Sequence, residues 1–365
     1  MNVPMYDLKR EYLADREAYL SLFDEVCRSA QFADGVYAAR FESAFGAYLG
    51  GMHAAAVNSG TDALILALKA LGVGPGDEVI VPSATFNATP GAVALTGAVP
   101  VFADCEEDTW QISPASARGL ITDKTKAVIG VHLYGGMFDV RAFRRLTREA
   151  GLFLIEDCAQ ALGAAFRGEP AGSFGDAACF SFYPTKNLGS FGEGGAVVSA
   201  DNALIDRVQL LKKHARTPEG DHLAVSGNMR MHGLQGAILT KKLERLPDFL
   251  ARKARIAACY RKAAAQSPAL TVQATEPGSV HAYHLFAVLP DDRDRFTEYL
   301  TARGIAFSVQ YPVPCHRQTA FAAFGGARSL PVTERLFSRV VTVPSYPYLT
   351  EEEILAVAAA LREYR

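Results

Sequence analysis

Short apolar runs alternate with helical patterns through the first half of the chain, and this alternation limits the possible folds more than any other feature. Residues 61–71, for example, place Leu64, Leu68 and Leu71 on one helical face. Strands that alternate with helices pair in parallel, so we expect an α/β fold whose sheet is covered on both faces. The runs that predict its buried strands are residues 54–58, 78–82, 99–103, 126–133, 152–157, 177–182 and 195–199.

The second half of the chain has a different pattern of predicted helices and strands. After Ser199 helical patterns predominate, and a new alternation of strands and helices begins near Ala282. A chain of 365 residues also exceeds what one hydrophobic core usually supports. We therefore place a boundary near Pro247, with residues 1–246 as a large domain that includes an N-terminal helical segment and residues 247–365 as a small α+β domain.

The balance of charges gives no reason to expect a polyanionic partner. The 37 lysines and arginines against 39 aspartates and glutamates leave a net charge of −2, so no overall field attracts nucleic acid or an anionic membrane. Residues 79–103 are uncharged, but Pro82, Pro90 and Pro100 would leave backbone groups unsatisfied in lipid. We expect no nucleic-acid or membrane partner. The charged start of the chain differs from a secretory signal, which predicts a cytoplasmic location.

The cysteines and histidines do not form a metal-binding pattern. The six cysteines are scattered singly without a C-x-x-C pair, so neither a zinc site nor a disulfide framework is predicted. His281 and His284 are close in sequence, but their segment reads better as a strand with a polar edge than as a metal pair. We therefore expect no metal site.

Candidate ligand-binding residues follow the predicted strands, because ligands of an open α/β sheet collect beyond the carboxyl ends of its strands. After the first run, Gly60 permits a close backbone approach and a helix begins near Thr61. The backbone N–H groups of this helix start, together with the Thr61 hydroxyl, can hold a phosphate. The alternative is an ordinary helix cap, which also favours serine and threonine.

Two charged residues follow other strand runs. Asp157 ends an apolar run, where a buried carboxylate needs a cation or a donor beside it; alternatively, it only caps the next helix. Lys186 follows the run at 177–182, within the stretch SFYPTKNLGSFGEGG. A lysine becomes a nucleophile when dry or cationic surroundings lower its pKa, although most lysines are solvated.

A cluster of glycines follows Lys186. It matches neither the P-loop pattern, in which the glycines precede the lysine, nor the pattern G-x-G-x-x-G. A nucleotide P-loop is therefore rejected, and a backbone that bends tightly beside the lysine remains. A phosphate site, an amine that can condense with a carbonyl and a buried carboxylate together suit pyridoxal phosphate, which requires a Schiff-base lysine and an acidic partner for its pyridine nitrogen.

Four stretches carry a distinctive combination of motifs, namely NSGTDALILALKALGVGPGDEVIVPSATFNAT, IEDCAQALGA, FSFYPTKNLGSFGEGGAVVS and GNMRMHGLQGAIL. Together they resemble the sugar-nucleotide aminotransferases of the DegT/DnrJ family, a branch of the fold-type-I pyridoxal-phosphate enzymes. The resemblance runs from about Pro4 to the stretch VPSYPYLTEEEI near the end and so covers nearly the whole chain. It implies a large, mostly parallel seven-stranded sheet domain and a smaller C-terminal α+β domain.

The resemblance implies roles for the residues that would contact the cofactor ring. Lys186 would hold pyridoxal phosphate as an internal aldimine and, once released, would shuttle the proton between the substrate and the cofactor. Asp157 would pair with the pyridinium nitrogen, a buried charge pair that serves the ring's electronics rather than stability. Gln160 would lie near the ring's 3-hydroxyl group. Phe86 would stack on the ring, whereas without the resemblance it would be read as a core residue.

Other residues would hold the cofactor's phosphate. The resemblance assigns this role to Gly60, Thr61 and Ser181. An asparagine from the neighbouring subunit also reaches the phosphate in this family, and Asn228 occupies the matching place. This implies a homodimer with shared active sites. Relatives commonly have Gly-Tyr before that asparagine, whereas this chain has Ser226-Gly227, so any substrate contact of an aromatic residue there is in doubt.

The resemblance also implies candidates for the residues that contact the sugar substrate. The segments 212–222 and 310–318 correspond to parts of the chain that line the sugar site in relatives. The candidates are Tyr183, His214, Tyr311 and His316, and the alternative for each is an ordinary loop residue.

The implied reaction consists of two half-transfers. L-glutamate would leave its nitrogen as pyridoxamine phosphate, and the amine would then pass to a keto group of a nucleotide-linked sugar. The sequence of residues 180–189 resembles enzymes that aminate C3 of a dTDP-3-keto-6-deoxyhexose. The alternative is a C4 aminotransferase that acts on a dTDP-, UDP- or GDP-4-ketosugar. In a related dehydratase a histidine replaces the lysine, so Lys186 argues against that activity. A non-catalytic regulatory protein remains the rival from another class.

Overall fold

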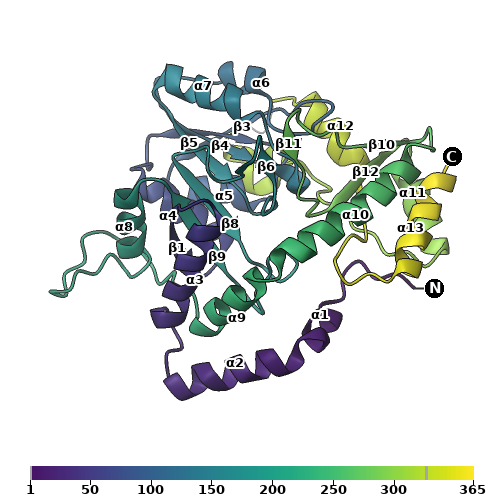
Figure 1. The fold of residues 1–365 in the computed structure, drawn as a ribbon. Helices are drawn as coiled ribbons and strands as arrows, with labels where there is room; N and C mark the ends of the chain where they lie inside the picture. The colour runs from purple at the N-terminus through teal and green to yellow at the C-terminus, as the bar shows by residue number, and fades with distance from the viewer. Residues whose placement is uncertain (1, 325–327) are drawn as a thin grey trace.

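A seven-stranded sheet forms the centre of the larger part of the molecule (Figure 1). The computed structural model describes residues 2–324 and 328–365. The strand order is β1-β9-β8-β5-β4-β2-β3, and neighbours pair in parallel except at β9, which runs antiparallel to both β1 and β8. All the predicted strands are present, as β1 (His53–Val57), β2 (Glu78–Pro82), β3 (Val99–Ala103), β4 (Thr125–Val131), β5 (Phe153–Asp157), β8 (Ala177–Ser181) and β9 (Gly195–Ser199).

Helices cover both faces of this sheet and divide its core in two. One face carries α4, α5 and α8, and the other carries α3, α7 and α9. Adjacent side chains of a strand point to opposite faces, so Ile80 packs on the α3 side while Val79 and Val81 pack on the α4 side. Burial on both faces explains the continuous apolar runs. The helices covering the sheet are α3 (Gly35–Tyr48), α4 (Gly60–Ala70), α5 (Ala88–Leu95), α6 (Pro114–Arg118), α7 (Val140–Ala150), α8 (Asn202–Leu211) and α9 (Gly233–Leu243).

Side-chain caps fix where helices begin beside the strand ends. Ser59 accepts a hydrogen bond from the backbone N–H of Asp62 at 3.1 Å and so starts α4 directly after β1. Thr350 and Glu353 form a capping box at the start of the closing helix. The first of these caps points a helix N-terminus at the carboxyl edge of the sheet, where ligands are expected.

A second core lies in the C-terminal part, where β10, β12 and β13 form an antiparallel sheet under α10, α11 and α13. Helix α10 contributes to both cores, since Leu250 packs on the core of the large sheet and Ile256 lies in the second core. The predicted boundary near Pro247 falls at the start of this helix and stays a prediction. The elements of this part are α10 (Leu246–Ala264), β10 (Leu270–Val272), β12 (Phe286–Pro290), α11 (Arg293–Ala302), α12 (Pro331–Arg339), β13 (Val341–Val343) and α13 (Glu351–Glu363).

Short elements connect the two parts. A small three-stranded sheet has the order β11-β6-β7, and β11 comes from the C-terminal half of the chain. The short elements are β6 (Ala165–Phe166), β7 (Glu169–Pro170), β11 (Ser279–Val280), η1 (Leu133–Gly135), η2 (Cys315–Arg317) and η3 (Thr319–Phe324).

His281 and His284 lie between β11 and β12 and not in a strand, so the prediction of a strand with a polar edge is wrong. Both side chains are buried at this junction, which explains the polar residues in an apolar context.

The N-terminal segment crosses from one part of the molecule to the other. Helices α1 (Leu8–Ala14) and α2 (Arg16–Ser29) run along the outside of the fold below α9 and α10 (Figure 1). Before α1, Val3 pairs with Ile305 in a parallel bridge. Within α1, Arg10 forms a salt bridge of 2.7 Å with Glu353 on α13. The described parts of the chain contain no helix with the length and hydropathy needed to cross a membrane.

Candidate active site

A cavity of about 450 Å³ opens at the carboxyl ends of the sheet strands. It lies between the large sheet and the segment around residue 311, so both parts of the chain contribute to its wall. The position agrees with the general rule for open α/β sheets. The structure brings together the following predicted site residues around it: Gly60, Thr61, Phe86, Asp157, Gln160, Ser181, Tyr183, Lys186 and Tyr311.

Asp157 is the buried carboxylate of this cavity. It ends β5 with 5% of its surface exposed. The Thr89 hydroxyl donates to its Oδ2 at 2.8 Å, and the backbone N–H of Ala159 donates to its Oδ1 at 3.1 Å. Burial raises the pKa of Asp157, while these hydrogen bonds and the charge of Lys186 oppose the rise. A cationic N–H group in the cavity would stabilise the charged form of this carboxylate.

Lys186 lies in the turn after β8, where its backbone N–H donates to the carbonyl oxygen of Tyr183 at 2.8 Å. Its side chain is half-buried, and in the part of the chain that the structure describes no ion pair holds its Nζ. Burial lowers its pKa to about 8, and the charge of Asp157 acts in the opposite direction. With this pKa about a tenth of the amine is neutral at pH 7, far more than in a solvated lysine, and the neutral form is the one that attacks carbonyl groups.

The start of α4 forms a cradle beside Ser181. A Cβ atom added to Gly60 would lie 2.7 Å from the Ser181 Cβ, so only glycine lets the helix start approach β8 this closely. A Cβ atom on Gly195 would collide with the carbonyl oxygen of Ser59, which explains one glycine of the cluster after the lysine. The N-terminus of α4 and the hydroxyls of Thr61 and Ser181 therefore line the cavity and suit a phosphate.

Aromatic and amide side chains also line the cavity. Phe86 is 54% exposed, so it is not a core residue, and its ring centroid lies 5.4 Å from that of Tyr311. Gln160 accepts a hydrogen bond from the backbone N–H of Tyr134 at 2.7 Å and donates to the Tyr311 hydroxyl at 3.1 Å. These contacts orient the Gln160 amide and connect the large sheet to the C-terminal part at the cavity.

The cavity fits the cofactor that the resemblance implies. It offers a helix N-terminus and hydroxyls for a phosphate, and Asp157 for a protonated ring nitrogen. Lys186 lies in the wall as the amine for an aldehyde, and Phe86 presents an exposed ring for stacking. The residues of the cavity thus suit the phosphate, the ring nitrogen, the aldehyde and the ring face of pyridoxal phosphate.

Three predicted site residues do not line the cavity. His316 is 1% exposed and lies between Ser83 Oγ at 2.6 Å and Glu334 Oε1 at 3.0 Å, which indicates a structural contact. His214 packs edge-on against His222 in the loop after α8. Asn228 also lies on that loop, where its Oδ1 accepts a hydrogen bond from Arg230 Nε at 2.8 Å.

The cavity is also lined by residues that sequence reasoning did not select, among them Tyr6, Glu193 and His284. Glu193 belongs to the glycine-rich stretch, where its charge was an available signal. His284 comes from the junction between β11 and β12. Burial lowers its pKa well below the usual value, and the charges of Lys186 and Lys253 act in the same direction, so it faces the cavity as a neutral imidazole.

One buried group has the composition of a metal site, formed by His132, Glu156 and Cys158. The Glu156 carboxylate already accepts hydrogen bonds from the backbone N–H groups of residues 172, 174 and 175, and the His132 ring contacts it at 2.9 Å. This carboxylate therefore ties the segment after β7 to the sheet, and its oxygens are not available as metal ligands.

Known proteins resemble this chain along nearly its whole length. It is 41% identical to the erythromycin biosynthesis sensory transduction protein EryC1 of Saccharopolyspora erythraea, covering 99% of both chains. It is 40% identical to the dTDP-3-amino-3,4,6-trideoxy-alpha-D-glucose transaminase of Streptomyces venezuelae, covering 99% of this chain and 96% of that protein. It is 39% identical to a UDP-N-acetyl-3-dehydro-alpha-D-glucosamine 3-aminotransferase of Acidithiobacillus ferrooxidans, covering 99% and 97%.

Solved structures agree with these relatives. The fold matches S. venezuelae DesV in complex with a ketimine intermediate with a TM-score of 0.96 and 40% identity, covering 99% of this chain and 98% of that chain. A sugar aminotransferase from Streptococcus pneumoniae, solved in pyridoxamine- and pyridoxal-phosphate forms, matches with a TM-score of 0.89 and 26% identity, covering 95% of this chain and 94–95% of that chain. The model of the DegT/DnrJ/EryC1/StrS aminotransferase family matches residues 14–362, and the chain belongs to this family of pyridoxal-phosphate-dependent aminotransferases.

Proposed function

We propose that this aminotransferase transfers an amino group from L-glutamate to C3 of a dTDP-linked 3-keto-6-deoxyhexose. The observation that carries the amino-transfer chemistry is the placement of Lys186 and Asp157 in one cavity with a cradle for phosphate. The C3 and dTDP assignments rest on the sequence of residues 180–189 and on the likeness to a transaminase named for a dTDP-3-amino sugar.

The side chains of the cavity would have separate roles in amino transfer. Pyridoxal phosphate, when bound, supplies an aldehyde that accepts the amino group and a ring that withdraws electrons from the reacting carbon. Lys186 would bind this aldehyde and, once released, would move a proton to and from the reacting carbon. Asp157 would hold the proton on the ring nitrogen. Gln160 and Phe86 would orient the ring, and Tyr311 lines the wall beside them.

We assign substrate contacts to Tyr183 and Tyr311, because both line the cavity near Lys186. His316 is not carried forward as a substrate residue, since both of its ring nitrogens have partners inside the protein. His214 stays a proposal that depends on a second subunit, like Asn228, because the loop after α8 lies outside the cavity of its own chain.

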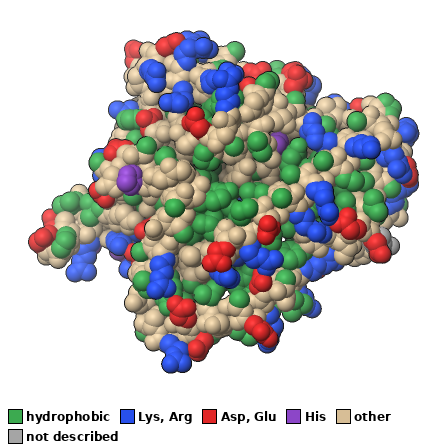
Figure 2. Space-filling view, viewed as in Figure 1, with side chains coloured by type: hydrophobic (Ala, Val, Ile, Leu, Met, Phe, Trp, Pro, Cys, Tyr) green, Lys and Arg blue, Asp and Glu red, His purple; other side chains and the backbone are tan. Residues whose placement is uncertain are grey.

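A homodimer would complete the site. The exposed Phe86 and Tyr183 lie at the cavity mouth, and Figure 2 shows hydrophobic side chains gathered in the middle of one face of the molecule. Apolar surface of this kind favours a protein partner. A two-fold arrangement of two copies would bring Asn228 of one chain to the phosphate cradle of the other.

Mixing two inactive variants tests this arrangement. Lys186→Ala and Asn228→Ala homodimers are each expected to be strongly impaired, because every site lacks one needed group. Unfolding and refolding them together should restore about a quarter of the wild-type rate, since half of the dimers are mixed and each mixed dimer has one complete site. If Asn228 served its own chain, no mixed dimer would contain a complete site and the rate would stay at the level of the parents.

The substrate assignment is tested with the pyridoxamine form. The protein is first converted with L-glutamate, which should remove the visible absorbance of the bound cofactor, and is then offered dTDP-, UDP- and GDP-linked 3- and 4-ketosugars. The dTDP-3-ketosugar should restore the absorbance fastest, because the other compounds leave polar groups of the site unpaired. A sample without glutamate is the control. Faster turnover of another ketosugar would reject the C3 or dTDP assignment.

A UDP-linked 3-ketosugar is the second candidate substrate, favoured by the likeness to the A. ferrooxidans enzyme. C4 amination remains the alternative within the family.

A purely regulatory role is suggested only by the name of the S. erythraea relative. The presence of Lys186, Asp157 and Phe86 around one cavity supports catalysis instead. A protein that stays colourless after addition of pyridoxal phosphate would reject the enzymatic proposal.

A further inference from the structure

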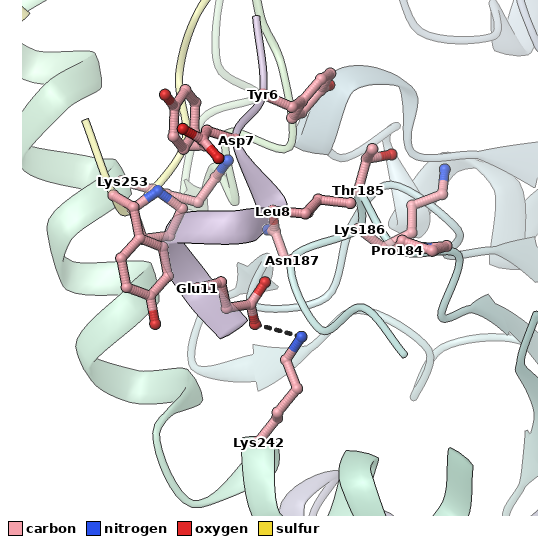
Figure 3. Close-up of a pocket in the computed structure, with 13 residues that line it drawn as sticks. Tyr6, Asp7, Leu8, Glu11, Pro184, Thr185, Lys186, Asn187, Lys242 and Lys253 are labelled. Atoms are coloured by element: carbon pink, nitrogen blue, oxygen red, sulfur yellow. Dashed lines mark ion pairs between the residues drawn. The ribbon is translucent and has the colours of Figure 1, made fainter. Parts of the chain in front are cut away.

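The back of the loop that carries Lys186 is covered by the N-terminal segment. Tyr6, Leu8 and Glu11 face Pro184–Asn187 across a narrow cavity of about 40 Å³ (Figure 3). The opposite side of the same loop faces the larger cavity that contains Asp157. The segment therefore lies directly behind the lysine, and its Tyr6 reaches both cavities.

A buried ion pair connects α1 to this loop. The Glu11 carboxylate contacts Lys242 Nζ of α9, as the dashed line in Figure 3 marks. Glu11 is 9% exposed and Lys242 4%. Lys242 Nζ also donates to the carbonyl oxygen of Gly189, the third residue after Lys186. Burial lowers the pKa of Lys242, and the Glu11 carboxylate opposes this change and so favours the charged form. The carboxylate of α1 thereby keeps a cation on the backbone of the loop.

Aromatic packing fixes the same loop two residues later. The Phe191 ring packs edge-on against Tyr19 of α2, with ring centroids 4.7 Å apart, and lies 6.4 Å from the ring of Tyr12. Lys242 Nζ lies 5.4 Å from the centre of the Phe191 ring, within cation–π range. The N-terminal helices thus contact the loop at Phe191 as well as through Lys242.

The loop transmits these contacts toward Lys186. A Cβ atom on Gly189 would collide with the carbonyl oxygen of Pro184, so a residue before Lys186 and a residue after it are packed closely together. Ser190 continues this arrangement, because its backbone N–H and its hydroxyl both donate to the carbonyl oxygen of Phe182 at 2.7 Å. A shift of Gly189 would therefore move Pro184 and the lysine between them. Buried charge pairs seldom add net stability, which makes a positioning role a better account of Glu11 and Lys242.

We propose that the N-terminal segment, residues 6–19, positions the catalytic lysine, and that Glu11 and Lys242 are the positioning residues of this contact. The proposal rests on the role assigned to Lys186 in the proposed function. It adds that the nitrogen of Lys186 takes its place in the cavity only while α1 holds Lys242 against Gly189.

The test compares Glu11→Gln with Glu244→Gln in the holoenzyme. Both changes remove one carboxylate paired with a lysine of α9, but Glu244 pairs with Lys241 at 2.8 Å on the exposed surface. The first readout is the pH midpoint of the visible absorbance of the bound cofactor, which reports the proton on the Lys186 nitrogen. The second is hydrogen–deuterium exchange of peptides spanning residues 182–194, which reports the order of the loop.

Glu11→Gln is expected to move the absorbance midpoint by at least about half a pH unit. It should also speed exchange of the loop about tenfold while leaving the sheet strands protected. Glu244→Gln should change neither quantity. Phe191→Leu provides an independent arm, because it removes the aromatic contact without creating an unpaired buried charge, and it should change both quantities in the same direction.

A lower melting temperature for Glu11→Gln with an unchanged midpoint and unchanged loop exchange would overturn the proposal, because that result describes a merely structural contact. If Glu11→Gln does not fold, Phe191→Leu decides by the same two readouts. Failure of the proposed function is recognised separately: the wild type would then show no visible cofactor absorbance that depends on Lys186, whereas loop exchange would still respond to Glu11→Gln.

Discussion

Replacing Lys186 by alanine is expected to abolish amino transfer, with a fall in kcat of about 10⁴-fold or more, because one side chain both binds the cofactor covalently and moves the proton. The fold should survive, since the lysine is half-buried and forms no ion pair with any of the residues that the structure describes. The measurement is a single-turnover assay with glutamate, followed by visible absorbance.

Two variants isolate the cause of this loss. Lys186→Arg keeps a positive charge opposite Asp157 but removes the nucleophilic amine, so it should be as inactive as the alanine variant. Lys241→Ala removes an exposed lysine of α9 and should leave the rate unchanged. Substantial turnover by Lys186→Arg would show that this position supplies charge and not a covalent bond.

The pKa of Lys186 predicts how cofactor capture depends on pH. Burial lowers this pKa from 10.5 to about 8, so in the cofactor-free protein the neutral amine is the minor form below pH 8 and the major form above it. The rate of covalent capture should therefore rise from about pH 7 to about pH 9 and then level off. A rate that is still rising steeply near pH 10 would indicate a solvated lysine.

The sheet could be predicted from sequence because its strands are buried on both faces. Each strand places residues such as Ile80 and Val81 in different cores, so apolar residues fill every position and the run becomes visible as a block. The segment 281–284, in contrast, was predicted as a strand and is not one. Its histidines are buried without belonging to a strand, and their place depends on how two distant parts of the chain meet.

The residues of the cavity, too, could be predicted from residue patterns alone only where they follow a strand of the sheet. Asp157, Lys186 and Gly60 each follow a strand, so the carboxyl edge of one sheet brings them together and sequence reasoning can find them. Tyr6 reaches the cavity from the segment before α1, which is far in sequence from the strands of the sheet. His316 belongs to a segment adjoining the cavity but turns inward to Ser83 and Glu334, and no sequence pattern reports that rotation.

Replacing Asp157 by asparagine is expected to lower kcat by about 10²–10³-fold, the scale expected when one preorganised group that stabilises developing charge is lost. The amide has nearly the shape of the carboxylate and can keep contacts with Thr89 and Ala159, so the fold and the cofactor site should persist. The charge that keeps a proton on the ring nitrogen is lost. Glutamate turnover and the absorbance spectrum of the bound cofactor, measured together, check this expectation.

The control for this change is Asp176→Asn, since Asp176 is a carboxylate that directly precedes β8 and does not line the cavity. Its Oδ2 accepts a hydrogen bond from the backbone N–H of Leu154 at 2.8 Å, at the opposite end of β5 from Asp157. The control variant should lose stability in thermal unfolding but keep the wild-type spectrum and kcat, because it alters packing and not the ring's charge. Equal losses of kcat in the two variants would mean that Asp157 acts through the sheet's stability. A loss confined to Asp157→Asn, with cofactor still bound, would assign its carboxylate to the electronics of the reaction.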